Sequence, residues 1–298
     1  MKGMFNPVKV LSLIAAILIQ CGTMHCQTNT KDFPVLKGPY LGQKLPGLTP
    51  EIFAPGIVSI PDAKYTTITF SGTGNEFYFY RWDGSNAKIF CCKVVDENWT
   101  QPEEVSFTAG YKPMETLITV DNNRIYFIWD KPLPPGEIET IFKIWFTDRT
   151  AKGWSEPKYA GPGMFVCTDR KGNLYVTDMS TVMQDGKTYL SKVITSEGRF
   201  VNFDRQVINP YYGVQAHPCI APDGSFMIFD IDSGQHLLVS FRKSDGTWGN
   251  AIDLVNIGFD TMAGGASITP DGKYLFFNCK GKLWWVDIKV IEELQPKI

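Results

Sequence analysis

The sequence predicts an all-β fold, a β-propeller of five four-stranded blades. Two segments carry nearly the same pattern 48 residues apart, "CIAPDGSFMIFD" from Cys219 and "SITPDGKYLFFN" from Ser267. The chain of 298 residues also combines 13% aromatic residues with 27 glycines and 19 prolines. This composition favours strands joined by tight turns over helices. A strand-rich repeat of about 50 residues is typical of propeller blades.

Three weaker copies of the pattern precede these two, in the segments 67–83, 117–130 and 165–178. The turns of the five copies end at Gly74, Asn123, Gly172, Gly224 and Gly272, so the steps are 49, 49, 52 and 48 residues. Asp-Gly and Asn-Asn fit the central positions of hairpin turns, where positive φ angles are required. Each turn is followed by an alternating aromatic run, which predicts a buried strand.

An aromatic residue recurs later in four of the units, before a short extended segment: Trp99, Trp154, Phe200 and Trp248. Each of these four units therefore contains four predicted strands. A four-stranded sheet with two apolar faces is buried when neighbouring blades stack in a ring. We expect these aromatic residues to lie between blades rather than to stack on a ligand.

The last unit, Ala266–Ile291, has only three predicted strands, and we expect the N-terminal segment Pro50–Ile60 to supply the fourth. Such pairing would close the ring and remove an exposed sheet edge. The alternative is six blades, if Pro50–Ile60 belongs to an incomplete extra unit.

The N-terminus predicts export. Lys2 and Lys9 precede a ten-residue apolar run, Val10–Ile19. This run is too short to span a bilayer but suits the core of a signal peptide. The sequence around Cys21 resembles a bacterial lipoprotein signal, which implies lipidation of this cysteine. We therefore expect a signal peptide at 1–20, a tether at 21–49 and the propeller at 50–298. A cleaved secretory signal and an uncleaved anchor stay open.

The "PDGK" copies resemble the TolB-like propeller repeats of exported bacterial proteins. The segments "PYLGQKLPGLTPEIFAPGIVS" and "WWVDIKVIEEL" also resemble the two ends of lipoproteins in that group. The resemblance implies a propeller and a periplasmic or outer-membrane lipoprotein of a Gram-negative bacterium. TolB itself has six blades, so its binding surface does not transfer directly.

The net charge and the positions of the cysteines argue against two classes of function, nucleic-acid binding and metal binding. The formal net charge is −2, from 29 basic and 31 acidic residues, which argues against a nucleic-acid binder. Cys91 and Cys92 would point to opposite faces of a strand, and the remaining cysteines of the predicted propeller lie in apolar runs. Because no Cys-x-x-Cys motif occurs, we expect no metal site and no cofactor. Disulfide pairing stays open.

Propeller sites usually surround the central channel. The positions just before each inner strand are Thr66, Glu115, Met164, His217 and Gly265. The positions after each second strand are mostly acidic. Ionisable residues of these two sets, with two neighbouring tryptophans, form the candidate ligand-binding set: Glu115, His217, Asp83, Asp130, Asp178, Asp230, Trp82 and Trp129. The acids after the second strands also include Asp232, and Asn278 takes this place in the last unit.

Three interpretations of the acids compete: turn-forming residues, a polar cup for a glycan, peptide or cation, and an acid–base pair for glycoside cleavage. No recognised catalytic motif occurs in the sequence. We therefore expect a non-catalytic ligand- or protein-binding propeller of the cell envelope. Its partners would be envelope proteins or a glycan or peptide, with membrane contact through the lipid anchor alone. The alternative is a carbohydrate-active enzyme whose carboxylates surround the channel.

Overall fold

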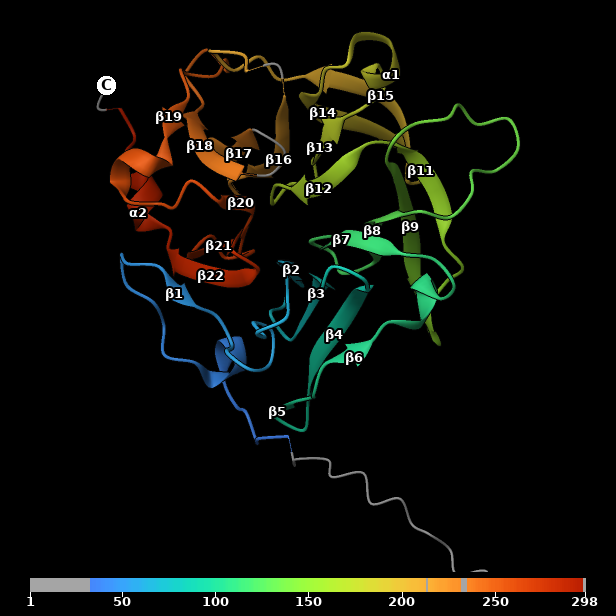
Figure 1. The fold of residues 1–298 in the computed structure, drawn as a ribbon, viewed down its shortest axis with the longest axis vertical. Helices are drawn as coiled ribbons and strands as arrows, with labels where there is room; N and C mark the ends of the chain where they lie inside the picture. The colour runs from blue at the N-terminus through green and yellow to red at the C-terminus, as the bar shows by residue number, and fades with distance from the viewer. Residues whose placement is uncertain (1–32, 213, 232–234, 297–298) are drawn as a thin grey trace, which may run out of the picture. The chain divides into compact units, whose positions relative to one another are not determined.

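Five antiparallel sheets surround a central axis in the computed structural model, which describes residues 33–212, 214–231 and 235–296 (Figure 1). The described chain therefore confirms the five-bladed propeller. Blade 1 comprises β2 (Tyr65–Phe70), β3 (Glu76–Trp82), β4 (Ala87–Val95) and β5 (Asn98–Trp99), with β6 (Glu103–Glu104) also paired to β4. Blade 2 comprises β7 (Pro113–Ile118), β8 (Arg124–Trp129), β9 (Lys143–Thr150) and β10 (Gly153–Trp154), with β11 (Lys158–Pro162) also paired to β9.

The remaining blades follow the same order from the axis outwards. Blade 3 comprises β12 (Met164–Thr168), β13 (Leu174–Asp178), β14 (Tyr189–Ser196) and β15 (Arg199–Arg205). Blade 4 comprises β16 (Gln215–Ile220), β17 (Phe226–Ile231), β18 (Gln235–Phe241) and β19 (Ile252–Asp253). Blade 5 comprises β20 (Ala263–Ile268), β21 (Tyr274–Cys279), β22 (Lys282–Asp287) and β1 (Glu51–Ile52). The only α-helices in the described residues are α1 (Val182–Asp185) and α2 (Lys289–Glu292), and neither could cross a membrane.

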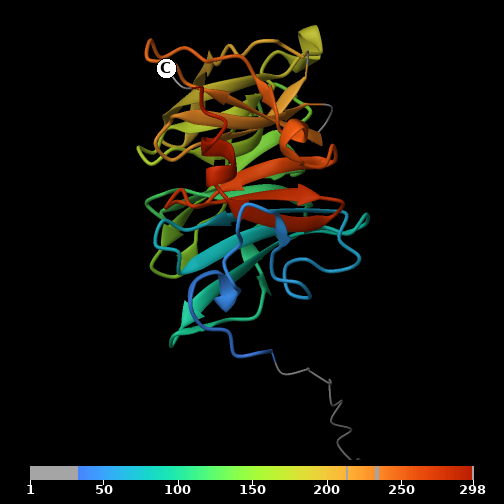
Figure 2. The same cartoon turned by 90° about the vertical axis from the view of Figure 1, so that its left-hand side faces the viewer.

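The ring is closed by β1, as the sequence predicts. β1 pairs antiparallel with β22, so that Glu51 lies opposite Trp285, and the Phe53 amide donates to the Leu283 carbonyl at 2.8 Å. Figure 2 shows this N-terminal strand beside the strands of blade 5. The Phe53 side chain is fully buried, with its ring 5.1 Å from that of Phe276. Closure therefore joins the first and last parts of the propeller through both backbone pairing and apolar contact.

The end of the predicted tether also contacts the propeller. The indole Nε1 of Trp99 donates to the Gly38 carbonyl at 2.8 Å, and the Asp287 amide donates to the Gly47 carbonyl at 3.0 Å. The domain boundaries at residues 20 and 49 stay predictions. The predicted signal peptide and the lipidation position Cys21 lie outside the described residues.

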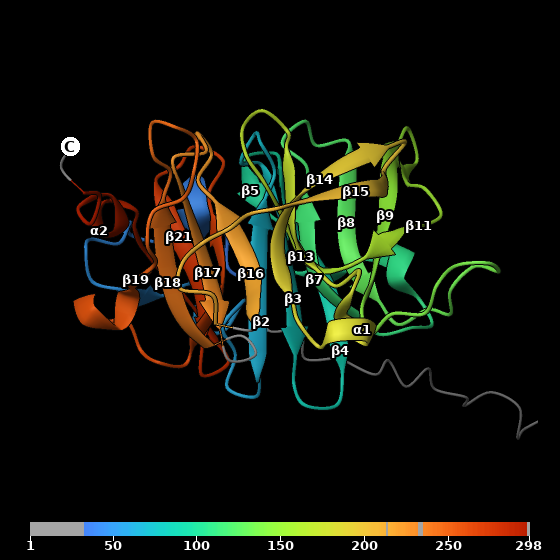
Figure 3. The same ribbon diagram turned by 90° about the horizontal axis from the view of Figure 1, so that it is seen from above.

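The two ends of the channel are formed by different connections. The hairpin turns between the first and second strands of the blades form one end, which we call the turn face. The loops between second and third strands, and those leading to the next blade, form the other end, the loop face; α1 lies there, at the lower side of Figure 3. On the turn face, the left-handed residue of the second turn is Asn122 (φ 60°). The repeat pattern in the sequence placed the end of this turn at Asn123, one residue too far along the chain.

Trp154, Phe200 and Trp248 lie between blades, as predicted, whereas Trp99 packs against Phe77 of its own blade at 5.3 Å. Trp154 of blade 2 packs edge-on against Tyr78 of blade 1, with 6.1 Å between ring centroids. Phe200 of blade 3 lies 5.9 Å from Tyr126 of blade 2. Trp248 follows β18 of blade 4 and donates from its indole Nε1 to Gln206, just after blade 3, at 3.0 Å. Each of these three interblade contacts fixes one blade against the preceding one.

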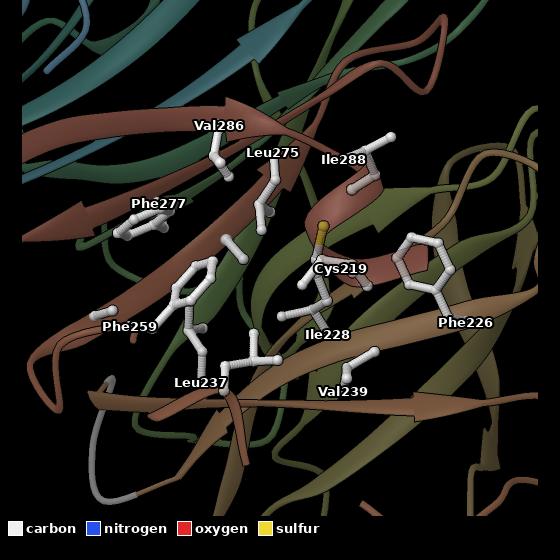
Figure 4. Close-up of a cluster of buried hydrophobic side chains, with 14 of the residues drawn as sticks. Cys219, Phe226, Ile228, Leu237, Val239, Phe259, Leu275, Phe277, Val286 and Ile288 are labelled. Atoms are coloured by element: carbon white, nitrogen blue, oxygen red, sulfur yellow. The ribbon is translucent and has the colours of Figure 1, made fainter. Parts of the chain in front are cut away.

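Packing between blades 4 and 5 illustrates the core. Figure 4 shows Cys219 among aliphatic and aromatic side chains of both blades, including Ile228 and Phe277. Cys219 is 2% exposed, and burial raises the pKa of its thiol well above the ordinary value. The cysteines of the described propeller, Cys91, Cys92, Cys167, Cys219 and Cys279, are free thiols. Cys92, Cys219 and Cys279 are buried, where they pack as small apolar residues.

Candidate functional site

Four of the five inner strands bulge near their loop-face ends. The register shifts between Met114 and Thr116 in β7, and corresponding shifts occur in β12, β16 and β20. Each bulge contains a residue with positive φ: Glu115 (36°), Phe165 (51°), His217 (48°) and Gly265 (59°). A bulge re-aims a side chain relative to a regular strand. In blade 1, β2 pairs regularly, and Tyr65 is its first residue.

The side chains of Tyr65, Glu115, Phe165 and His217 contact one another. Glu115 Oε1 lies 3.3 Å from the Tyr65 hydroxyl and 3.2 Å from His217 Nε2. The Phe165 ring meets the His217 ring edge-on at 5.0 Å. Asp230, at the end of β17, completes the group. We call these six residues the channel plug: Tyr65, Glu115, Phe165, His217, Asp230 and Gly265.

Asp230 fixes the orientation of His217. Both carboxylate oxygens of Asp230 lie 2.8 Å from His217 Nδ1, and Oδ2 also accepts from the Gly265 amide at 2.9 Å. Both ring nitrogens of His217 are thus engaged by carboxylates. Glu115, in contrast, has one orphaned atom: its Oε2 is buried and has no hydrogen-bond partner within the described residues.

The plug is buried and charged. His217 is 6% exposed, Glu115 7% and Asp230 0%. Burial by itself would lower the pKa of His217, but Asp230 and Glu115 outweigh it and hold this pKa well above the ordinary value. Burial raises the pKa of Asp230, against the opposing effect of His217. The two carboxyl groups therefore favour the protonated form of His217.

Gly265 makes room for the plug. A Cβ atom at this position would lie 2.3 Å from the Tyr65 hydroxyl, far inside van der Waals contact. The φ of 59° also suits glycine better than most residues. The glycine is therefore required both by its backbone conformation and by the tyrosine across from it.

Hydrogen bonds between blades explain which second-strand residue reaches the plug. Thr177 Oγ1 accepts from the His217 amide at 2.9 Å, and Asn278 Oδ1 accepts from the Thr66 amide at 3.2 Å. Asp230 makes the same kind of bond to the Gly265 amide. The structural equivalent of Asp230 in blade 3 is therefore Thr177 and not Asp178. Asp178 and Asp230 follow similar aromatic runs in the sequence, but they do not occupy equivalent positions in the structure.

The other predicted residues lie elsewhere. Asp83 accepts from the amides of Ser85 and Asn86 in its own loop, and Asp130 accepts from the Lys112 amide. The remaining three also have other surroundings: Asp178 forms an ion pair with Arg205 at 3.2 Å, Trp82 is 41% exposed at the end of β3, and Trp129 is 4% exposed and packs edge-on against Trp145.

The structure thus brings together Glu115, His217 and Asp230 from the candidate set, and adds two residues. Tyr65 and Phe165 were missed because the channel positions were placed one residue away, at Thr66 and Met164. Phe165, Glu115 and His217 each lie seven residues before the left-handed residue of the following turn, which is Gly172, Asn122 and Gly224, respectively. Counting the second turn from Asn123 hid this alignment. Tyr65 had no such signal, since β2 lacks the bulge.

A small cavity of about 60 Å³ lies on the turn-face side of the plug, lined by residues that include Thr116, Phe165 and Ala266. It offers room for a few water molecules. Sites for small organic ligands are commonly 300–1,000 Å³. No group of three His, Cys, Asp or Glu side chains within the described ranges is arranged to hold a metal ion.

Comparisons with solved structures find weak similarities to other proteins. A TolB from Acinetobacter baumannii aligns at 10% identity and TM-score 0.45, covering 74% of this chain and 54% of that one, so this chain spans about half of that TolB. A putative TolB from Agrobacterium tumefaciens aligns at 15% and 0.47, covering 72% and 74%. A gluconolactonase from Xanthomonas campestris aligns at 12% and 0.46, covering 85% and 99%. No protein-family model and no curated protein matches.

The class of protein follows from topology and site together. It is a five-bladed β-propeller whose channel contains a buried Tyr–Glu–His–Asp network. At these identities and TM-scores, the similarities carry no inference about ligand or activity.

Proposed function

We propose that the protein is a non-catalytic ligand- or protein-binding β-propeller of the bacterial cell envelope, similar in its repeats to the TolB-like group. The observation that carries the proposal is the engagement of His217 by Asp230 and Glu115. A general base needs a free lone pair within reach of a substrate proton. Both nitrogens of this imidazole already face carboxylates, so the plug is organised to hold the blades together.

The same geometry weighs against glycoside hydrolysis, the alternative. That reaction requires two carboxyl groups on either side of a glycosidic bond. The His217 ring occupies the space between Glu115 and Asp230, where the bond would lie. The cavity of about 60 Å³ beside the plug is also smaller than a sugar site.

The loop face supports a binding role. In the described part of the chain, sixteen large apolar side chains are exposed, and ten of them lie on this face. This uneven distribution of exposed apolar side chains favours the loop face over the turn face as an interaction surface. The ten are Trp82, Tyr111, Ile138, Ile141, Met183, Val207, Tyr211, Tyr212, Val214 and Met262.

The β8–β9 loop, residues 130–142, is the most prominent element of this face and extends outward from the ring (Figures 1 and 3). It contains Pro132, Pro134 and Pro135, and Ile138 is 87% exposed. Glu137 is paired with Arg199 at 2.8 Å, which ties the loop to blade 3. Loops of this length within compact domains are usually functional. We therefore place the partner-binding surface here.

Site-specific crosslinking tests the proposal. A photoreactive amino acid would replace Ile138 on the loop face, and a matched control would carry it at the exposed Lys171 on the turn face. In cells that natively produce the protein, we expect a discrete crosslinked species from position 138 and none from position 171. Equal crosslinking from both positions, or none from either, would contradict a loop-face partner. Release of sugar from a polysaccharide, abolished by Glu115→Gln, would establish the enzyme alternative instead.

A further inference from the structure

A second cavity, of about 410 Å³, lies on the turn face between blades 1 and 5. Its walls come from four separate segments: the N-terminal residues 38–40, the β2–β3 turn, the β4–β5 turn and the β20–β21 turn. The volume falls within the range of small-molecule sites. None of the candidate site residues predicted from the sequence lines it.

The apolar part of this cavity is aromatic and held in place. Tyr40, Phe70 and Trp99 line it. The Tyr40 ring packs edge-on against Phe70 at 5.5 Å and against Tyr274 at 5.2 Å. Both the backbone N–H and the indole N–H of Trp99 donate to the N-terminal segment, to the carbonyls of Leu36 and Gly38. The rings are therefore preorganised, which reduces the entropy lost on binding.

Backbone strain contributes to this arrangement. Tyr40 and Leu41 have φ angles of 52° and 61°, a left-handed conformation that is uncommon for residues other than glycine. Two consecutive residues of this kind cost free energy that the surrounding packing must offset. The conformation turns the N-terminal segment so that Tyr40 reaches the aromatic cluster.

The polar part of the cavity consists of hydrogen-bonding groups without a basic side chain. Ser71, Thr73, Asn75, Glu97 and Asp271 line it, while lysine and arginine are absent from the lining residues. The two carboxylates each have a lysine partner outside the lining. Lys37 lies 3.8 Å from Glu97, and Lys273 lies 3.1 Å from Asp271.

We propose that this cavity binds a neutral saccharide of one or two sugar rings. A sugar ring presents an apolar C–H face, which matches Tyr40 and its aromatic neighbours, and hydroxyl groups, which match the polar rim. An anionic ligand would meet two carboxylates and no cation in the lining. A wholly apolar ligand would leave the rim groups desolvated and unpaired. The site is separate from the loop face and extends the proposed binding function to a second surface.

The test uses three disaccharides, maltose, cellobiose and N,N′-diacetylchitobiose, and one aromatic cation, phenethylammonium, each titrated into the purified protein. Saturation-transfer NMR would detect binding, and tryptophan fluorescence would give the dissociation constant. Thr73→Trp fills the cavity from an exposed turn position, so folding is expected to be retained. Lys171→Trp introduces the same side chain at an exposed turn of blade 3, away from the cavity lining, and is the matched control. We expect saturable binding of at least one disaccharide, weakened at least tenfold by Thr73→Trp and changed less than twofold by Lys171→Trp.

Three outcomes would overturn the proposal: no saturable binding of any of the three sugars, binding that survives Thr73→Trp, or equal loss in both variants. Saturable binding of phenethylammonium without any sugar would identify a cationic aromatic ligand and would also overturn it. The crosslinking result at Ile138 is independent of this cavity. Failure of one experiment therefore leaves the other proposal standing.

Discussion

Replacing His217 by asparagine isolates the charge at the centre of the channel plug. Asparagine tolerates the left-handed backbone better than most residues, so the φ of 48° can be kept. Its side-chain amide takes nearly the place of the imidazole Nδ1 and can still donate to Asp230. It is too short to reach Glu115 and carries no positive charge. The variant therefore leaves two buried carboxyl groups without their cation.

The expected cost is large. Breaking a buried ion pair by removing one partner destabilises a protein by about 3–5 kcal/mol. At about 2–4 °C per kcal/mol for a domain of this size, the melting temperature would fall by about 6–20 °C. Thermal unfolding followed by circular dichroism at pH 6 would measure it. The double variant His217→Asn/Glu115→Gln removes one of the two carboxylates and should recover part of the loss, since the two positions are coupled.

The pH dependence gives a second readout. The folded-state pKa of His217 lies well above its ordinary value. Its stabilisation is therefore complete below about pH 6.5 and is lost as the pH rises through the folded-state pKa. The wild type should become less stable from pH 6.5 to 9, and His217→Asn should show a flatter profile. A loss below about 1 kcal/mol at pH 6, or parallel profiles for the two proteins, would refute the charged plug.

Four further predictions follow from other contacts. Gly265→Ala should lower the free energy of unfolding by about 1–3 kcal/mol in urea titrations, and Tyr65→Phe in the same chain should restore part of it, because the clashing atom is the Tyr65 hydroxyl. Phe200→Ala removes an interblade ring that is 8% exposed and should cost about 3–5 kcal/mol in the same assay; a loss below 1 kcal/mol would contradict the wedge role. The buried Cys219 should resist thiol reagents in the native state and react only in denaturant, since burial raises its pKa. Cys21→Ala should abolish incorporation of radiolabelled palmitate; labelling that persists would disprove lipidation at this residue.

The sequence carries enough information to predict the fold because propeller blades are local. Each hairpin turn uses Asp, Asn or Gly where positive φ is needed, and each second strand is a run of aromatic residues that neighbouring blades bury. Ring closure by β1 was also predictable, because the last unit lacks a fourth strand. The shift from Asn123 to Asn122 arose since either residue tolerates a left-handed conformation.

The site was less predictable because its residues are positioned by bulges. A bulge inserts one residue and changes which side chain faces the axis. Nothing in the residues around Glu115 or His217 announces a left-handed conformation, and β2 has no bulge at all. Asp178 is the last residue of β13 and Asp230 the last but one of β17, and this difference of one residue sends the first to Arg205 and the second to His217. Such differences depend on pairing across strands and cannot be counted along the chain.

The five inner strands contribute five different residues to the plug: Tyr65, Glu115, Phe165, His217 and Gly265. A five-fold ring of one residue type could line a pore, because like side chains repeat around the axis and leave its centre open. Here the large ring of Tyr65 fills the space that Gly265 leaves, and the charge of His217 is matched by Glu115 and Asp230. Because the five residues differ in size and charge, they can fill the centre of the channel. A ligand that required passage along the axis would have to separate a buried imidazolium from its carboxylates, at a cost of about 3–5 kcal/mol. Surfaces away from the axis, the loop face and the turn-face cavity between blades 1 and 5, need no such disruption, which is why the binding proposals are placed there.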